Sequence, residues 1–441
     1  MPTRKATPLH NKILIGLLAG AATGAVCQLT LGKSNPNLVW VATNLAKPTG
    51  DVFLTLIFMV VVPLLFSALV LGVCELGDAA KVGKIGFLSL LMTILLSGTA
   101  VGIGILGVNL VAPGKHLSEA QRTELIATYS DQKQGAKSIE AAKKEPEDPP
   151  VLGIIPKNPF KEMNRALEGG LLPFMFFALV FGVALASVEP EKALPLKAVL
   201  EALFATTQRM IEFAMRLAPY GVFALIFRTT ATLGFDLFRA VGLYVALVLV
   251  ALALHLFGVY SLVLRFIAKR DPALFFRQIW LVILTAFSTS SSNATLPAAM
   301  KAAQEDVGLP RNISSFVLTV GATANQNGTA LFEGITILFL CQLFGIDLSL
   351  AQQFTVMGLA IAAGIGTAGI PGGAWPMIAT VLATLGVPAE AIGIVFGIDR
   401  ILDMSRTVVN VVGDITIAAC VSRLFGTAED IRNDQLELSE A

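Results

Sequence analysis

Residues 397–419, GIDRILDMSRTVVNVVGDITIAA, decide the fold of this chain. The stretch is long enough to cross a bilayer as one helix. Polar residues interrupt it at Asp399, Arg400, Asp403, Arg406, Asn410 and Asp414. From Asp399 to Asp414 they follow at steps of four, three, four and four, which places one on nearly every turn of a single helix face. An ionised group at the bilayer centre costs at least about 2.5 kcal/mol, so this face must meet a protein interior or a wet cavity. It therefore indicates a ligand or ion site.

The composition is that of a polytopic membrane protein. Of the 441 residues, 55% are hydrophobic and 14% are charged, whereas a soluble domain carries about 25% charged residues. The formal net charge of +1 gives no indication of a nucleic-acid partner. No CxxC pair, metal-ligand spacing or histidine cluster occurs, so we expect neither a disulfide framework nor a zinc or haem cofactor.

Several apolar stretches upstream are each long enough to span a bilayer. They cover residues 13–31, 52–74, 85–111, 171–188, 199–227 and 240–264. Arg4, Lys5 and Lys12 precede the first stretch without a small-residue cleavage site, which predicts an uncleaved first helix and a cytoplasmic N-terminus. The absence of long tails and glycosylation-rich loops favours the inner (plasma) membrane of a prokaryote.

Two segments of this region carry concentrated charge. Residues 114–150 are polar and low in complexity, so we expect a solvated external loop there. The stretch 199–227 is amphipathic, and its charged residues are expected to face away from lipid. These residues are Glu201, Arg209, Glu212 and Arg216.

Two short apolar hairpins follow. In the first, residues 275–287 lead into the tip STSSSNATLP at 288–297 and a second arm to residue 303. In the second, residues 350–364 lead into GIGTAGIPGG at 364–373 and an arm to residue 385. Each arm is too short to cross the bilayer, so both hairpins are predicted to be re-entrant, with tips that line a cavity.

A broken helix is predicted between the hairpins. Apolar arms at 313–320 and 330–344 are interrupted by GATANQNGT at 321–329. An unwound stretch of this composition would offer carbonyl and amide groups to an ion. The order of hairpin, broken helix, hairpin and polar-faced helix suggests a doubled unit of inverted repeats.

Four motifs in this order, STSSSNATLP, NQNGTAL, GTAGIPGG and DRILDMSRTVVNVVGD, resemble the glutamate transporter family of dicarboxylate/amino acid:cation symporters. The resemblance implies an all-α membrane protein with eight transmembrane helices and two re-entrant helical hairpins, built of inverted repeats and assembled as an elevator-type homotrimer. Scaffold helices would lie in residues 1–84 and 151–236, an external loop in 114–150, and the moving transport domain in 85–113 and 237–441. The second hairpin would be the outer gate.

The resemblance also implies a substrate site. Arg406 would hold the substrate's side-chain carboxylate, for which a guanidinium offers a bidentate fork, and Asp403 would bind the α-amino group. The alternative for Arg406 is an intrahelical ion pair with Asp403 or Asp399, and for Ser292 and Thr329 it is helix capping. The implied substrate-binding set is Ser291, Ser292, Thr329, Gly369, Asp403, Arg406, Thr407 and Asn410.

Coupling ions follow from the same resemblance. A family sodium site is matched by Gly321, Asn325, Asn410 and Asp414. A second family sodium site lacks its acid, because Asn327 stands there. On the third helix Thr93 and Leu96 stand where a tyrosine and a threonine are expected, and only Ser97 is kept.

Glu333 resembles the glutamate that carries a proton in animal relatives, since a carboxyl group withdrawn from water can load and release a proton near neutral pH. The alternative is a permanently neutral or hydrogen-bonded side chain.

Other departures from the family pattern concern charge and gating. Ser290 and Met404 occupy the two positions where relatives place an additional arginine, and Arg400 lies about 100° off the polar face. Gln326 in the broken helix and Trp375, just beyond the tip of the second hairpin, are also unusual.

These patterns predict a secondary active symporter that imports L-aspartate or L-glutamate with Na⁺, H⁺ or both, and that has no cofactor. A C4-dicarboxylate carrier is the alternative within transporters, and Asp403 argues against it. An anion channel is kept open by the family's side-conductance, although two gated hairpins favour alternating access. An intramembrane enzyme is the weakest hypothesis, because Ser290–Ser292 have no His or Lys partner in the neighbouring apolar segments.

Overall fold

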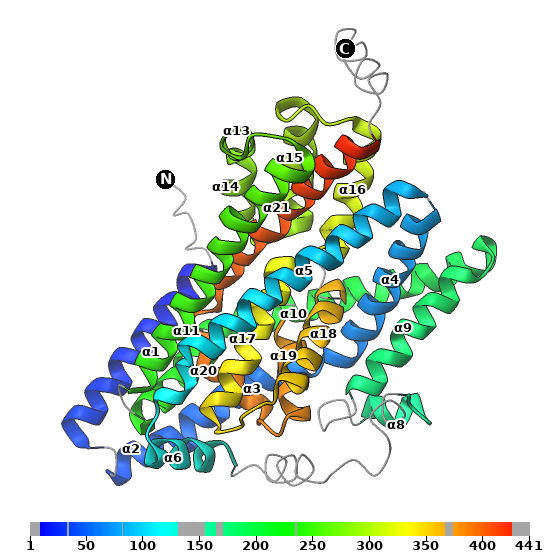
Figure 1. Ribbon diagram of the computed structural model, residues 1–441. Coiled ribbons are helices and arrows are strands. Elements are labelled where there is room, and N and C mark those ends of the chain that lie inside the picture. Colours follow the sequence, from blue (N-terminus) through cyan, green and yellow to red (C-terminus); the bar gives the residue numbers. More distant parts are fainter. Residues whose placement is uncertain are drawn as a thin grey trace, which may run out of the picture.

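Helices make up all of the secondary structure in the residues that the computed structural model describes, which are 9–32, 35–81, 83–130, 155–164, 171–233, 236–366 and 374–425. The long helices lie side by side, and several of them, such as α1 (Leu9–Leu31), α5 (Lys84–Val111) and α21 (Asp399–Phe425), run in nearly the same direction in the view (Figure 1). Long apolar helices are what a chain must form in a bilayer, where only a helix satisfies its own backbone groups.

The early helices form one packed group. α1 (Leu9–Leu31) and α3 (Lys47–Phe58) both pack along α10 (Pro190–Leu233), while α4 (Val61–Lys81) packs against α9 (Leu171–Ser187). Small residues allow the closest of these contacts, because α1 turns a glycine towards the α10 backbone at every fourth position from Gly16 to Gly24. α2 (Pro36–Val41) and a π-helical turn (Ala42–Ala46) precede α3.

Two predictions for these early helices need correction. The second span is longer than residues 52–74, because helix runs from Pro36 to Lys81 with only an irregular turn at Met59 and Val60.

The segment 114–150 is not all loop, because α6 (Glu119–Ser130) is helical. It follows α5 (Lys84–Val111) and a short 3₁₀ turn (Pro113–His116). Residues 131–150 lie outside the described residues. α8 (Pro159–Asn164) leads into α9.

The charged face of α10 is on the surface of the chain. Arg209 and Glu212 form an ion pair and are both more than half exposed. No described part of this chain covers them, so the chain by itself provides no interior for this face.

A long helix then carries the chain into the first hairpin. It comprises α11 (Asp236–Ala253), α12 (Tyr260–Val263) and two π-helical turns (Leu254–Val259 and Leu264–Ala268). The hairpin consists of α13 (Pro272–Gln278) and α14 (Trp280–Thr289), which are bent by 57°, and of α15 (Ser292–Lys301) with a π-helical turn (Ala302–Asp306). Its tip is only Ser290 and Ser291, tighter than the predicted 288–297, because Ser290 adopts the left-handed conformation that reverses the chain.

The broken helix and the second hairpin follow. α16 (Arg311–Ala324) and α17 (Asn327–Leu343) are separated by Asn325 and Gln326 alone, so the unwound stretch is shorter than the predicted 321–329. α18 (Leu350–Gly366) and α19 (Ala374–Thr384) are the arms of the second hairpin. Its tip, which includes Gly369, lies outside the described residues. A 3₁₀ turn (Ala389–Ile392) and α20 (Gly393–Phe396) lead to α21 (Asp399–Phe425).

α17 and α21 form the centre of the molecule. Every residue of α17 is buried, and α21 is mostly buried as far as Val421. α5 packs on α17, α16 packs on α21, and both hairpins contact these central helices (Figure 1). In the described part of the chain, five helical stretches are long and apolar enough to cross a membrane, or six if α13 and α14 form one span. Within α1 and α9 the apolar helical segments are shorter, Ile15–Leu31 and Pro173–Ser187.

Candidate functional site

The polar face of α21 is turned into the protein, as the energetics of burial require. Asp399, Asp403, Arg406, Asn410 and Asp414 are all buried. They come from consecutive turns of one helix, and the side chains that meet them come mainly from the broken helix α16–α17. The face divides into an arginine centre near its beginning and a carboxyl centre near Asp414.

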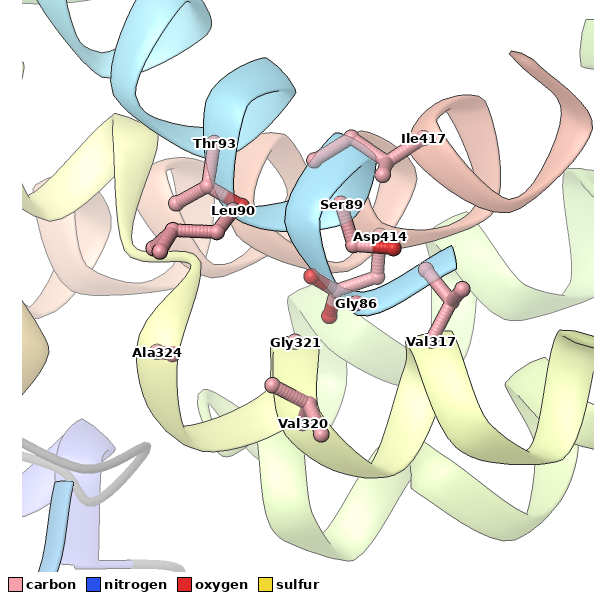
Figure 2. A pocket seen from close by; sticks show the side chains of 10 residues that line it. All are labelled: Gly86, Ser89, Leu90, Thr93, Val317, Val320, Gly321, Ala324, Asp414 and Ile417. Carbon is pink, nitrogen blue, oxygen red and sulfur yellow. The ribbon is translucent and has the colours of Figure 1, made fainter. Parts of the chain in front are cut away.

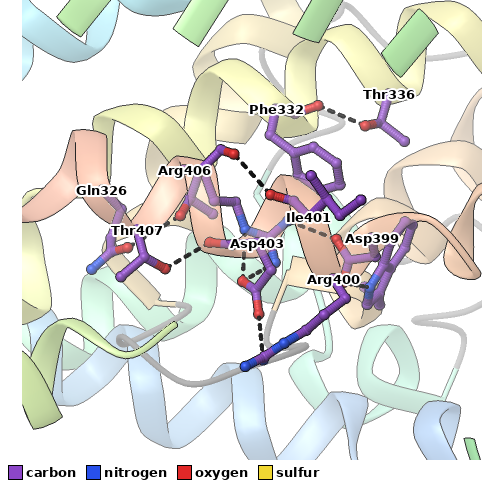
Figure 3. Close-up of polar contacts among 12 residues, drawn as sticks. Gln326, Phe332, Thr336, Asp399, Arg400, Ile401, Asp403, Arg406 and Thr407 are labelled. Atoms are coloured by element: carbon purple, nitrogen blue, oxygen red, sulfur yellow. Dashed lines mark hydrogen bonds and ion pairs between the residues drawn. The ribbon is translucent and has the colours of Figure 1, made fainter. Parts of the chain in front are cut away.

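Arg406 is held by two carboxylates of its own helix. Its Nε and Nη2 donate to Asp403 Oδ1 at 3.0 and 2.7 Å, and its Nη1 donates to Asp399 Oδ1 at 3.2 Å (Figure 3). The intrahelical ion pairs named above as the alternative for Arg406 are therefore present. With one cation and two carboxylates, this buried cluster carries one formal negative charge in excess.

Aromatic rings and a second arginine surround this cluster. The guanidinium of Arg406 lies over the ring of Phe332 on α17, 4.3 Å from its centroid. Arg400 approaches Asp403 Oδ2 at 3.8 Å from the opposite side to Arg406 (Figure 3). Trp375, at the start of α19, donates its indole N–H to Asp399 Oδ2 at 2.7 Å.

Asn410 joins α21 to the first turn of α17. Its Oδ1 accepts from the backbone N–H groups of Gly328 at 2.7 Å and Thr329 at 3.3 Å, which have no partner within their own helix. Its Nδ2 donates to Gln326 Oε1 at 2.6 Å and to Thr329 Oγ1 at 3.0 Å. A glycine is required at 328 because a Cβ there would collide with the carbonyl oxygen of Arg406. The helices thus cross at backbone contact beside the arginine.

Ser291 and Ser292 have different environments. Ser291 is the N-cap of α15, its Oγ accepting from the N–H of Ala294 at 3.2 Å. Ser292 is buried, and its Oγ has no hydrogen-bond partner among the described residues. The capping alternative for Ser292 is therefore wrong, because its neighbour Ser291 is the cap and the Ser292 hydroxyl is available to a ligand. Thr407 is buried and donates to the carbonyl of Asp403 at 2.8 Å.

The carboxyl centre combines α5, α16 and α21. Asp414 Oδ1 accepts from Asn325 Nδ2 at 2.7 Å, while Asn325 Oδ1 has no hydrogen-bond partner in the described chain. A cavity of about 10 Å³ adjoins Asp414, a size that suits one water or one small cation. Figure 2 shows Asp414 facing Ser89 of α5, with Gly321 of α16 close to the carboxylate.

Asn327, which the resemblance aligns with an acid of a second sodium site, belongs to a chain of hydrogen bonds. Ser97 Oγ donates to Asn327 Oδ1 at 2.6 Å, and Asn327 Nδ2 donates to Tyr260 OH at 3.0 Å. Tyr260 in turn donates to the carbonyl of Val409 at 3.0 Å. Each polar group of the Asn327 side chain therefore has a protein partner.

Glu333 is buried one turn after Thr329 and has no such partner. Its side chain is 1% exposed, and neither oxygen makes a hydrogen bond within the described residues. Arg406 is the cation whose charge acts on it. An ionised carboxyl group without a hydrogen bond is costly in such surroundings, so a proton or a cation has to accompany it.

The structure therefore brings the predicted residues of α17 and α21 together, while Gly369 lies outside the described residues. Sequence reasoning missed Phe332, Tyr260 and Ser89, which lie among apolar residues and carry no recognisable spacing. It singled out Trp375 as a departure that bears on gating, and the structure adds its hydrogen bond to Asp399.

The family model described as the sodium:dicarboxylate symporter family matches residues 9–424. The chain belongs to this family. It is 34% identical to the proton/sodium-glutamate symport protein of Bacillus subtilis, over 95% of this chain and 93% of that protein. It is 31% identical to the proton/glutamate-aspartate symporter of Escherichia coli, over 93% and 92%. A C4-dicarboxylate transport protein of Anaeromyxobacter is 27% identical, over 97% and 92%.

Membership in the sodium:dicarboxylate symporter family makes this chain a membrane transporter and excludes the enzyme hypothesis. The family assignment confirms the resemblance drawn from the four motifs.

Proposed function

We propose that this symporter imports L-aspartate or L-glutamate together with cations. The observation that carries the proposal is the pairing of Arg406 with Asp403. A substrate carboxylate can take the guanidinium fork from Asp403, and the freed Asp403 can then bind the substrate ammonium group. Each exchanged ion pair then keeps a partner of opposite charge, and the second carboxylate of the substrate adds one negative charge that the coupled cations would compensate.

A C4-dicarboxylate is the second candidate, supported by the name of one relative. Such a substrate would displace Asp403 from Arg406 without providing an ammonium group for it. The displaced carboxylate would keep only Arg400, 3.8 Å away and on the rim of the cluster. Because an unpaired buried charge is costly, the pairing favours an amino acid. The names of two relatives, a glutamate and a glutamate-aspartate symporter, point the same way.

The remaining substrate contacts belong to the same proposal. Ser292 would bind a substrate carboxylate through its unpartnered hydroxyl. Asn410 and Thr329 would contact the substrate by exchanging hydrogen bonds that they now make with Gln326. Further contacts are proposed for Ser291, Gly369 and Thr407.

Coupling would use one cation at Asp414 and a proton on Glu333. The small cavity and the free Asn325 Oδ1 support a cation there, with Gly321 and Asn410 as further ligands, and the Ser89 hydroxyl faces the same space. The closed chain around Asn327 supports the loss of the second sodium site. A symporter of this kind would need fewer sodium ions than relatives that keep the acid.

The wider architecture is proposed on the family resemblance. The chain would have eight spans arranged as inverted repeats. It would form a homotrimer in a prokaryotic inner membrane, with the N-terminus in the cytoplasm. The packing of α1 and α3 on α10 supports a scaffold, and that of α5, α16, α17 and α21 on one another supports a separate transport domain. The second hairpin would be the outer gate.

Uptake into liposomes by the purified protein tests the function. Radiolabelled L-aspartate is offered under an inward Na⁺ gradient and an inward pH gradient, each imposed alone. We expect accumulation that responds to the pH gradient and competition by L-glutamate. Stronger competition by succinate than by L-glutamate would instead favour the C4-dicarboxylate function. Uptake that needs Na⁺ and does not respond to the pH gradient would contradict the proposed coupling to a proton.

A further inference from the structure

Trp375 is an unusual residue to find at the start of a gating hairpin arm. It is fully buried at the first turn of α19, directly after the tip. A tryptophan buried this deeply needs a partner for its indole N–H, and Trp375 finds it in Asp399 Oδ2 at 2.7 Å. The bond joins α19 to the first residue of α21.

The bond reaches the substrate arginine through one carboxylate. Asp399 uses its other oxygen, Oδ1, to accept from Arg406 Nη1 at 3.2 Å. Asp399 is thus held from two sides, by the hairpin and by the arginine. When Asp403 leaves the guanidinium, Asp399 is the group that keeps Nη1 in place, and its own orientation depends on Trp375.

Ring packing connects the same elements. The indole meets the ring of Phe332 edge-on at 5.7 Å, and Phe332 lies under the Arg406 guanidinium. On its other side the indole lies 5.1 Å from Phe396 of α20. Phe396 in turn meets Phe53 of α3 at 5.0 Å, so the rings extend from the arginine to the early helices.

We propose that Trp375 is a positioning residue of the substrate site. Because it is bonded to Asp399, the packing of α19 against α21 and the orientation of Arg406 depend on each other. The arginine then presents its fork to a distal carboxylate only when this arm of the hairpin is packed. The proposal rests on the proposed function, since it concerns the arginine that would bind the substrate.

Intrinsic fluorescence provides the first test. The chain has three tryptophans, and Trp40 and Trp280 are both more than half exposed, away from the site. In the W40F/W280F variant, the emission of Trp375 should change saturably with L-aspartate, with the midpoint found by radioligand binding. Radioligand binding without any change in emission would overturn the proposal and leave the proposed function intact. Absence of radioligand binding would instead contradict the proposed function.

The Trp375→Phe variant provides the second test, with Trp280→Phe as its matched control. Loss of one hydrogen bond to a charged group should weaken L-aspartate binding about tenfold. Selectivity for L-aspartate over L-asparagine, which lacks the distal carboxylate, should narrow by a similar factor. The control should change neither value. A merely structural tryptophan would lower the yield of folded protein but leave affinity and selectivity unchanged, and that result would overturn the proposal.

Discussion

At the scale of single residues, the proposed substrate site depends on the guanidinium fork of Arg406. Replacing it in the Arg406→Lys variant keeps the positive charge but removes the planar pair of donors that Asp403 now occupies. We expect the affinity for L-aspartate to fall by about 10- to 100-fold, in line with the loss of a charge-assisted hydrogen bond. Equilibrium binding of radiolabelled L-aspartate measures it.

The control for this change is Arg209→Lys, in the exposed ion pair with Glu212 on α10. Exposed pairs contribute little, so this variant should bind as the parent protein does. Equal affinities in both variants and the parent would show that Arg406 only neutralises its neighbouring acids.

Glu333 is the residue proposed to carry the coupled proton, because a buried carboxyl group without hydrogen bonds is costly unless its charge is compensated. The Glu333→Gln variant keeps the shape and can never ionise. It should still exchange internal for external L-aspartate, while net uptake driven by a pH gradient falls by about tenfold or more. Liposome assays measure the exchange of L-aspartate and its net uptake separately.

Glu201→Gln is the matched control, since Glu201 is exposed on α10. It should leave both assays unchanged. If net uptake by Glu333→Gln still follows the pH gradient, Glu333 is not the residue that carries the coupled proton.

At the scale of elements, the crossing of α17 and α21 depends on Gly328. A methyl group there would meet the Arg406 carbonyl and Val409, so Gly328→Ala must push the two helices apart. Overpacking of this kind costs about 1–3 kcal/mol and would also displace the Asn410 cap. Gly358→Ala on α18, where a Cβ meets nothing within 4 Å, should be harmless or slightly stabilising.

Thermal unfolding followed by size-exclusion chromatography compares the two variants. A lower midpoint for Gly328→Ala alone, with loss of L-aspartate binding, is the expected result. Equal midpoints would mean that the crossing can relax without cost.

The same elements show what the sequence could reveal. The burial of the α21 face followed from its spacing and from the cost of charge in lipid, both of which are local properties. The length of the unwound stretch in the broken helix could not be predicted in this way. Gly328 and Thr329 become helical through a cap that Asn410 provides from another helix. The role of Trp375 was likewise out of reach, since its partner Asp399 lies 24 residues away, beyond a turn whose geometry no pattern predicts.

At the scale of the whole molecule, we expect the number of coupled ions to depend on charge balance at the central helices. Asn327 closes a neutral hydrogen-bond chain between Ser97 and Tyr260, so no cation is needed there. In Asn327→Asp the buried carboxylate would keep the Ser97 hydroxyl as a donor, but it would face the Tyr260 oxygen that now accepts from Asn327 and would lack a counter-ion. A cation should therefore be drawn to the site, which raises the Na⁺ requirement of the transporter.

The measurement is the slope of log affinity for L-aspartate against log Na⁺ concentration. We expect the slope to rise by about one in Asn327→Asp, because one further cation would bind with each substrate molecule. The control is Asn109→Asp, since Asn109 is an exposed amide near the far end of α5 whose side chain contacts Gln353 of α18 and not Asn327, Ser97 or Tyr260. An unchanged slope in Asn327→Asp, with binding intact, would mean that a proton neutralises the new acid and that the second sodium site cannot be restored by its carboxylate alone.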